Sequence, residues 1–99
     1  MNLVIQEFEW APKEQPNGNV QHIMKHNVSP EEAEEILEFP EEALIRKTRQ
    51  GYRLAFGRTV AGRYLLVVFL LKKSGLVRVI TARDMKEIER RYYRSQIKI

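Results

Sequence analysis

The sequence contains no cysteine, which excludes disulfide bonds, thiolate metal sites and cysteine nucleophiles. Its longest apolar run covers the eight residues 64–71, whereas a membrane-spanning helix needs about 20. Five glycines are present, and they form no phosphate-binding loop. The first residues lack the positive start and apolar core of a signal peptide. These absences predict a cytoplasmic protein that does not enter a membrane.

The charges are divided unevenly along the 99 residues, which are enough for one domain covering residues 1–99. Residues 1–45 hold two lysines against ten glutamates, a formal charge of −8. Residues 46–99 hold 15 basic residues against three acidic ones, a formal charge of +12. The modest net charge of +4 therefore hides an acidic half and a basic half.

The acidic half predicts a short strand followed by two helices. Alternating side chains indicate a strand over residues 2–10, and Pro12, Pro16 and Asn17-Gly18 then interrupt regular structure. A short helix follows over residues 19–26. Ser29 is a suitable N-cap for a second helix, with Pro30 in its first turn and Phe39-Pro40 at its end. The expected buried faces are Val20, Ile23 and Met24 in the first helix and Ala33, Ile36 and Leu37 in the second.

The basic half predicts four strands, over residues 44–48, 52–57, 63–71 and 76–81. The links between them are short, so we expect an antiparallel sheet. The third strand is apolar on both faces and should be central, while alternation in the second places Tyr52, Leu54 and Phe56 inward and Arg53 and Ala55 outward.

A final helix should complete the fold. Thr81 and Asp84 resemble a capping box that opens a helix reaching about Ser95, with Met85, Ile88 and Tyr92 on its buried face. The predicted class is therefore α+β: a short strand, two helices, a four-stranded antiparallel sheet and a C-terminal helix.

The last segment carries groups suited to cutting RNA without a metal ion. A carboxylate can take the proton of a 2′-hydroxyl, guanidinium groups can stabilise charge on the phosphate, and a phenol or a histidine can assist proton transfer. The residues of these types in this segment are Arg83, Arg90, Arg91, Arg94, Glu87, Glu89, Tyr92 and Tyr93. The alternative is a solvated helix face with internal ion pairs such as Glu87–Arg91.

Two histidines four residues apart, His22 and His26, form a second candidate site. Neutral imidazoles at this spacing can bind a transition metal, but no third ligand is evident, and the glutamate of the zinc-protease motif is missing. We therefore predict no metal and no other cofactor. Proton transfer by His26, or phosphate binding with Lys25, is the functional alternative to a structural role.

Basic residues along the predicted sheet form a third signal and favour a nucleic-acid surface. The other explanation is that these charges simply keep the sheet soluble. The residues are Arg46, Lys47, Arg49, Arg53, Arg58, Arg63, Lys72, Lys73 and Arg78.

Several segments together resemble the BrnT-type toxins of bacterial type II toxin–antitoxin systems. The first are Phe8-Glu9-Trp10, residues 19–23 (NVQHI) and residues 25–33 (KHNVSPEEA). Residues 57–59 (GRT) and Gly62-Arg63 follow before an apolar strand, and the last are residues 80–83 (ITAR), Glu89-Arg90 and Tyr93. These segments cover most of the chain in the expected order.

The resemblance implies a RelE-like fold, metal-independent RNA cleavage that arrests translation, and a small DNA-binding antitoxin of the ribbon-helix-helix type. Arg83, Glu89, Arg90 and Tyr93 match the terminal motif of the family, and Lys25 and His26 match its helix motif. Two positions depart from the pattern: Ala11 replaces the usual aspartate after Trp10, and Asn27 replaces the usual glycine after His26.

The sequence thus predicts an endoribonuclease whose catalytic residues are Arg83, Glu89, Tyr93 and His26. Lys25, Arg53, Arg58, Arg63 and Arg90 are the expected RNA-binding residues, and a homo-oligomer is compatible with the sequence. The alternative is a non-catalytic module of the same fold that holds nucleic acid or an acidic protein. One experiment separates the two, because a binding module shifts RNA in a salt-sensitive manner and leaves its length unchanged.

Overall fold

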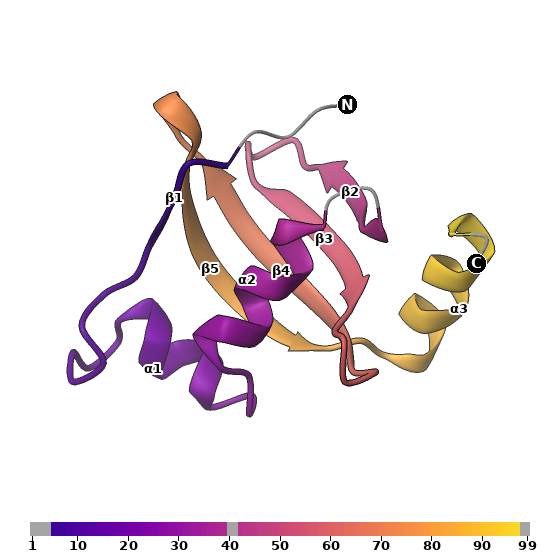
Figure 1. Ribbon diagram of the computed structural model, residues 1–99, viewed down its shortest axis with the longest axis horizontal. Coiled ribbons are helices and arrows are strands. Elements are labelled where there is room, and N and C mark those ends of the chain that lie inside the picture. The colour runs from indigo at the N-terminus through magenta and orange to yellow at the C-terminus, as the bar shows by residue number, and fades with distance from the viewer. Residues whose placement is uncertain (1–4, 40–41, 98–99) are drawn as a thin grey trace.

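The computed structural model describes residues 5–39 and 42–97 and shows helices packed on a mixed sheet (Figure 1). Residues 2–4 of the predicted first strand and Pro40 lie outside the described residues. No helix of the described part is long and apolar enough to cross a membrane. In chain order the elements are β1 (Glu7–Glu9), α1 (Asn19–Met24), α2 (Pro30–Glu38), β2 (Leu44–Lys47), β3 (Arg53–Arg58), β4 (Tyr64–Leu71), a 3₁₀ turn (Lys73–Gly75), β5 (Leu76–Asp84) and α3 (Glu87–Gln96).

The sheet has five strands in the order β1-β5-β4-β3-β2. The strands β2 to β5 form the predicted antiparallel hairpins, whereas β1 pairs in parallel with β5. The expected four-stranded sheet is therefore corrected to a mixed sheet of five strands, because the backbone of the predicted short strand completes the open edge of β5. As predicted, β4 is internal, and it pairs on both sides.

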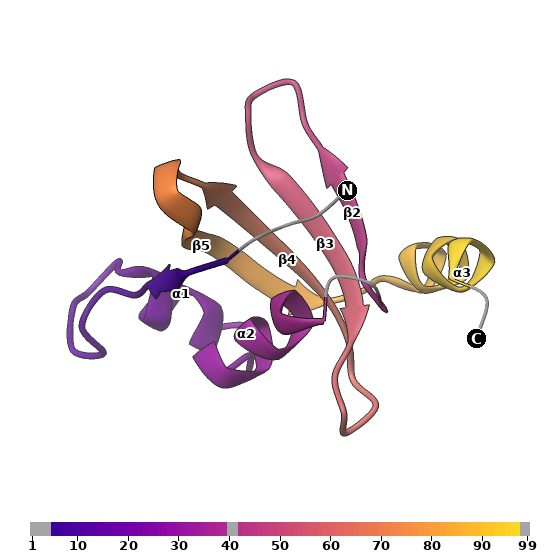
Figure 2. The same cartoon turned by 45° about the horizontal axis from the view of Figure 1, so that its top comes forward.

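Helices α1 and α2 cover one face of the sheet and bury the larger core (Figures 1 and 2). The Ser29 hydroxyl accepts the Glu32 N–H at 3.1 Å, and the Glu32 carboxylate accepts the Ser29 N–H at 3.0 Å. This confirms Ser29 as the cap and fixes the start of α2. The predicted stripe of Ala33, Ile36 and Leu37 is buried, as are Val20 and Ile23 in α1. Met24 is 47% exposed, because α1 ends there and the chain turns away.

Alternation along the strands sends a second set of apolar side chains to the opposite face, where α3 packs. This smaller core contains Phe56, Leu66, Met85 and Tyr93. Figure 2 shows α3 set apart from α1 and α2. Because the sheet is covered on both faces, Ala55 is fully buried in the larger core. The prediction that Ala55 faces outward is wrong.

The predicted start of the last helix is also wrong, and of its predicted buried residues only Met85 is buried. The strand β5 continues through Asp84, because Arg83 and Asp84 pair with Leu66 and Leu65 of the long strand β4. Thr81 and Asp84 therefore form no capping box, and α3 begins at Glu87. Because the helix starts later than predicted, different residues face the sheet. Ile88 is 73% exposed and Tyr92 is 40% exposed, while Tyr93 is buried.

Helix α2 approaches β3 closely at Gly57. A β-carbon at this position would lie 2.8 Å from Cγ2 and 3.1 Å from Cδ1 of Ile36. The absence of a side chain here therefore sets the distance between the helix and the sheet, and with it the packing of the larger core.

We expect Gly57→Ala to destabilise the protein by about 1–3 kcal/mol through this overpacking. Urea unfolding would measure the loss. In an Ile36→Ala background the contacting atoms are gone, so the penalty of Gly57→Ala should shrink sharply. An equal penalty in both backgrounds would contradict this explanation.

Candidate active site

Arg83 and Glu89 form a two-pronged ion pair between the end of β5 and the first turn of α3. The two nitrogen–oxygen distances are 2.8 and 2.9 Å. Glu89 also accepts the Lys86 N–H at 2.8 Å and so caps the helix. Arg83 uses its remaining Nη1 hydrogen on the Asp84 carbonyl, which leaves Nε–H and one Nη2–H without an acceptor among the described residues. Arg83 can therefore bind a further anion while it stays paired.

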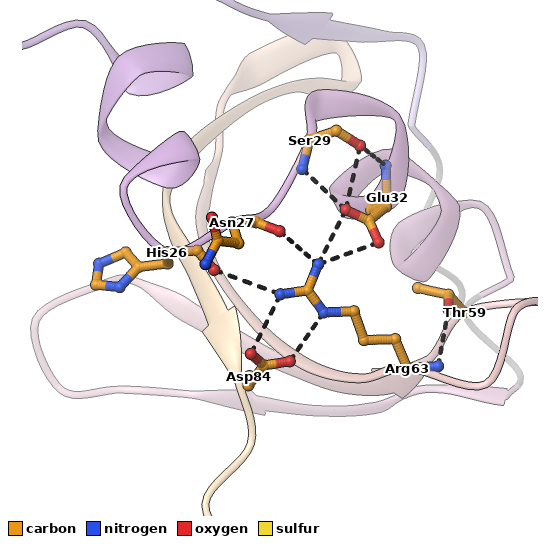
Figure 3. A network of polar contacts seen from close by, with 7 residues as sticks. All are labelled: His26, Asn27, Ser29, Glu32, Thr59, Arg63 and Asp84. Carbon is orange, nitrogen blue, oxygen red and sulfur yellow. Dashed lines mark hydrogen bonds and ion pairs between the residues drawn. The ribbon is translucent and has the colours of Figure 1, made fainter.

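Arg63, by contrast, uses all five of its N–H donors within the described structure (Figure 3). Its Nε and Nη2 donate to Asp84, and its Nη1 donates to Glu32. The remaining hydrogens reach the backbone carbonyls of His26 and Asn27. Arg63 thus ties the α1–α2 turn, the start of α2 and the end of β5 together.

The pKa values of the three carboxyl groups in these ion pairs are all lowered. Hydrogen bonds from Arg63 lower the pKa of Asp84, and those from Arg83 lower the pKa of Glu89. Partial burial raises the pKa of Glu32, but the hydrogen bond from the Ser29 N–H and the contacts with Arg63 outweigh it and bring the pKa below its ordinary value. All three groups therefore stabilise the fold in their charged form.

Three guanidinium groups surround the phenol of Tyr64 at the start of β4. The Cζ atoms of Arg58, Arg90 and Arg94 lie 5.6, 4.9 and 5.0 Å from the ring centre. Among the described residues none of these arginines forms an ion pair with a carboxylate. Because Arg90 follows Glu89 directly, this cluster adjoins the Arg83–Glu89 pair. We name Arg58, Tyr64, Arg90 and Arg94 the tyrosine–arginine cluster.

Tyr93, predicted as a catalytic residue, lies beneath this cluster. Its side chain is 2% exposed, its hydroxyl donates to the Glu42 carbonyl at 2.8 Å, and its ring meets that of Tyr64 edge to face at 6.0 Å. Burial raises the pKa of this phenol, and the charge of Glu42 adds to the effect. In this arrangement Tyr93 supports Tyr64.

Of the residues predicted at the end of α1, His26 contacts Arg63 through its backbone carbonyl. Lys25 and His26 are exposed, and Figure 3 shows the imidazole of His26 directed away from Arg63, although the His26 carbonyl accepts from Arg63. The His22 and His26 rings meet edge to face at 5.6 Å, and His22 Nε2 lies 3.1 Å from the Thr81 hydroxyl. The described residues contain no group of three or more His, Asp or Glu side chains placed to hold a metal ion.

Arg53 and Arg58 lie at opposite ends of β3. They are five positions apart along an extended strand, which corresponds to roughly 17 Å. The structure therefore brings Arg58 and Arg90 together at Tyr64, whereas Arg53 lies at the other end of β3.

Two of the cavities that border the described residues lie near the predicted elements of the site. The larger, about 760 Å³, lies between Trp10, α1 and α2, and none of the predicted catalytic residues lines it. The smaller, about 460 Å³, is lined by Arg58, Thr59, Val60, Tyr93 and residues of the α2 end. The smaller cavity meets the tyrosine–arginine cluster at Arg58, and its lining also includes the carboxylate residues Glu35 and Glu42.

Tyr64 and Arg94 are absent from the set of residues that we predicted as functional. Two patterns could have identified them: Arg90 and Arg94 lie one helical turn apart, and the tight 59–63 turn places Tyr64 opposite Arg58 in the hairpin. What the sequence does not contain is the docking of α3 against β4, which joins the two patterns.

The chain has the fold of a ribonuclease toxin. It matches the 1.1 Å crystal structure of the Brucella abortus ribonuclease toxin BrnT with a TM-score of 0.56. The sequences are 24% identical, and the match covers 68% of this chain and 84% of that one. The family model of the BrnT ribonuclease toxins of type II toxin–antitoxin systems matches residues 12–89, and the chain belongs to this family. No match was found among curated proteins.

The backbone conformation explains why asparagine can stand at position 27, where the family usually has glycine. Asn27 adopts a backbone φ of 60°, a left-handed conformation that glycine and asparagine tolerate best, so asparagine can replace the usual glycine there.

The match to the family model ends at Glu89, and Arg90, Tyr93 and Arg94 lie beyond it. Their roles must therefore be argued from the contacts that they make.

Arg63→Met should lower the free energy of unfolding at pH 7 by roughly 2–3 kcal/mol, because two carboxylates and two carbonyls lose their donor. The pKa values of Glu32 and Asp84 are lowered in the folded state, so wild-type stability is full above about pH 5 and falls as the pH drops through the folded values. The variant should lose less stability between pH 5 and pH 2, as measured by urea unfolding.

Arg91→Met is the matched control, because it removes the exposed ion pair with Glu87 on α3. Its stability should stay within about 0.5 kcal/mol of the wild type. An acid dependence in Arg63→Met as steep as that of the wild type would refute the structural role of Arg63.

Proposed function

We propose that the protein is a metal-independent endoribonuclease that cleaves RNA and thereby inhibits translation. The observation that carries the proposal is the Arg83–Glu89 pair beside guanidinium groups that no carboxylate of the described residues neutralises. Such a surface attracts a phosphodiester and supplies both a carboxylate and cations to it. Membership of a ribonuclease toxin family supports the same conclusion.

In this proposal Arg83 and Arg90 hold the scissile phosphate, and Glu89 is the general base. The unpaired Nε–H and Nη2–H of Arg83 make the first contact. A phosphate bound there leaves the ion pair in place but adds negative charge beside Glu89, which opposes the effect of Arg83 that lowers the pKa of this carboxylate. Glu89 then becomes a better acceptor for the proton of the 2′-hydroxyl.

The remaining predicted residues take supporting roles. Arg58 borders the smaller cavity and contacts phosphate or a flanking base there, and Tyr93 positions the site from below. Lys25 and Arg53 contact the RNA backbone farther from the scissile bond, while His26 is the alternative general base, which requires its ring to turn toward the site. Because its five donors are engaged, we assign Arg63 to positioning the site, although it was predicted to bind RNA.

Alanine at Arg83 or Glu89 should reduce RNA cleavage by about 10²–10³-fold, because one change removes a phosphate ligand and the other the base. The measurement is cleavage of RNA by purified protein in the presence of EDTA, followed on a denaturing gel. Expression of the wild type alone should inhibit growth, and both variants should relieve the inhibition.

Glu87→Ala and Arg91→Ala serve as controls, since this ion pair lies on the same helix and is exposed to solvent. Both controls should cleave RNA at the wild-type rate. Intact RNA together with salt-sensitive binding would reject catalysis and establish a non-catalytic binding module. Activity abolished by EDTA would reject metal independence.

The partner that we propose is a small DNA-binding antitoxin of the ribbon-helix-helix type that presents acidic residues to the tyrosine–arginine cluster. A short reading frame next to this gene should encode it, with a strand-helix-helix pattern. The co-purified complex should be inactive on RNA and should dissociate faster at high salt than at low salt. A complex unaffected by Arg58→Ala and Arg90→Ala would place the antitoxin elsewhere.

A further inference from the structure

The phenols of Tyr64 and Tyr93 differ in the direction of their hydrogen bonds. Arg94 donates to the Tyr64 oxygen from Nε at 3.4 Å and from Nη2 at 3.3 Å. The hydroxyl proton of Tyr64 has no acceptor among the described residues, so it can be given to an incoming group. Tyr93, in contrast, spends its proton on the Glu42 carbonyl and is buried.

The surroundings of Tyr64 favour the loss of that proton. Three guanidinium groups within 6 Å of the ring stabilise the phenolate that forms. The hydrogen bond from Arg94 lowers the pKa of this phenol, and the charges of Arg94, Arg58 and Arg90 lower it further against a smaller opposing effect of burial. The side chain is half-buried, which leaves one edge open to a ligand.

The position of Tyr64 relative to Glu89 also suits a pair of proton-transfer groups. Arg90 packs over the Tyr64 ring, and the preceding residue in α3 is Glu89, whose carboxylate is held by Arg83. The end of β5 is attached to the same place, because the Met85 N–H donates to the Tyr64 carbonyl at 3.0 Å. A phosphate held between Arg83 and Arg90 would therefore lie between the carboxylate and the phenol.

We propose that Tyr64 is the general acid of this site and donates its hydroxyl proton to the 5′-oxygen that leaves when RNA is cleaved. The inference rests on the ribonuclease function proposed above. The 2′-oxygen forms a bond to phosphorus as its proton passes to Glu89. The bond from phosphorus to the 5′-oxygen breaks, its electron pair stays on that oxygen, and the Tyr64 proton completes the new 5′-hydroxyl. The other product is a 2′,3′-cyclic phosphate, and water returns the proton from Glu89 to the phenolate.

The test compares two RNA substrates that differ in one atom. The position cut by the wild type is mapped first, and a second RNA is then made with sulfur in place of the 5′-oxygen at that bond. A thiolate leaves without being protonated, so the second RNA does not need a general acid. Tyr64→Phe should cleave the ordinary RNA about 10²–10⁴-fold more slowly than the wild type. It should cleave the sulfur RNA at close to the wild-type rate.

Tyr92→Phe is the matched control. Tyr92 also accepts hydrogen bonds from an arginine, Arg46, at 3.0 and 2.7 Å, but it is packed against one guanidinium group in place of three. This variant should cleave both RNAs as the wild type does. The phenylalanine at position 64 keeps the ring on which the arginines pack, and cleavage of the sulfur RNA shows that the variant is folded.

The outcomes separate the two proposals. A wild type that leaves the ordinary RNA intact would overturn the ribonuclease function, and the role of Tyr64 with it. A wild type that cleaves the ordinary RNA, together with a Tyr64→Phe variant that is equally impaired on both substrates or unimpaired on both, would overturn the general-acid role alone.

Discussion

The contacts of Arg63 are the constraint on which the rest of the site depends. One guanidinium joins the turn after α1, the first turn of α2 and the last residue of β5, segments that are far apart in the sequence. Arg83 precedes the Asp84 that Arg63 holds, and Tyr64 follows Arg63 itself. The ion-pair network between helices and sheet therefore also sets the spacing between the proposed phosphate ligand and the proposed acid.

Basic residues on the two faces of the sheet have different partners. On the side of α1 and α2, glutamates of the acidic half neutralise basic residues of the other half, as in Glu32–Arg63, and at the sheet edge Glu9 pairs with Lys72 and Arg78. On the side of α3, the arginines near Tyr64 are paired with aromatic rings. The three arginines of the tyrosine–arginine cluster thus place positive charge beside the candidate site.

The sequence predicted those features of the fold that depend on contacts between residues close together in the chain. The Ser29 cap, the buried stripe of α2 and the hairpins of the basic half are confirmed, because neighbouring residues specify them. The cap proposed for Thr81 and Asp84 failed because pairing with β4 outweighed a local pattern. The sequence predicted that Arg83, Glu89 and Arg90 belong to one site. Tyr64 was missed because the arginines around it come from β3 and α3, which only the tertiary fold brings together.

The register of β5 has a consequence for synthesis of the chain. Arg63 can make its contacts with Asp84 only after β5 has been translated, and Arg90 and Arg94 emerge later still. A ribosome-bound chain that stops before residue 94 therefore has most of the scaffold but lacks the complete tyrosine–arginine cluster, so the proposed activity requires that residue 94 has been translated.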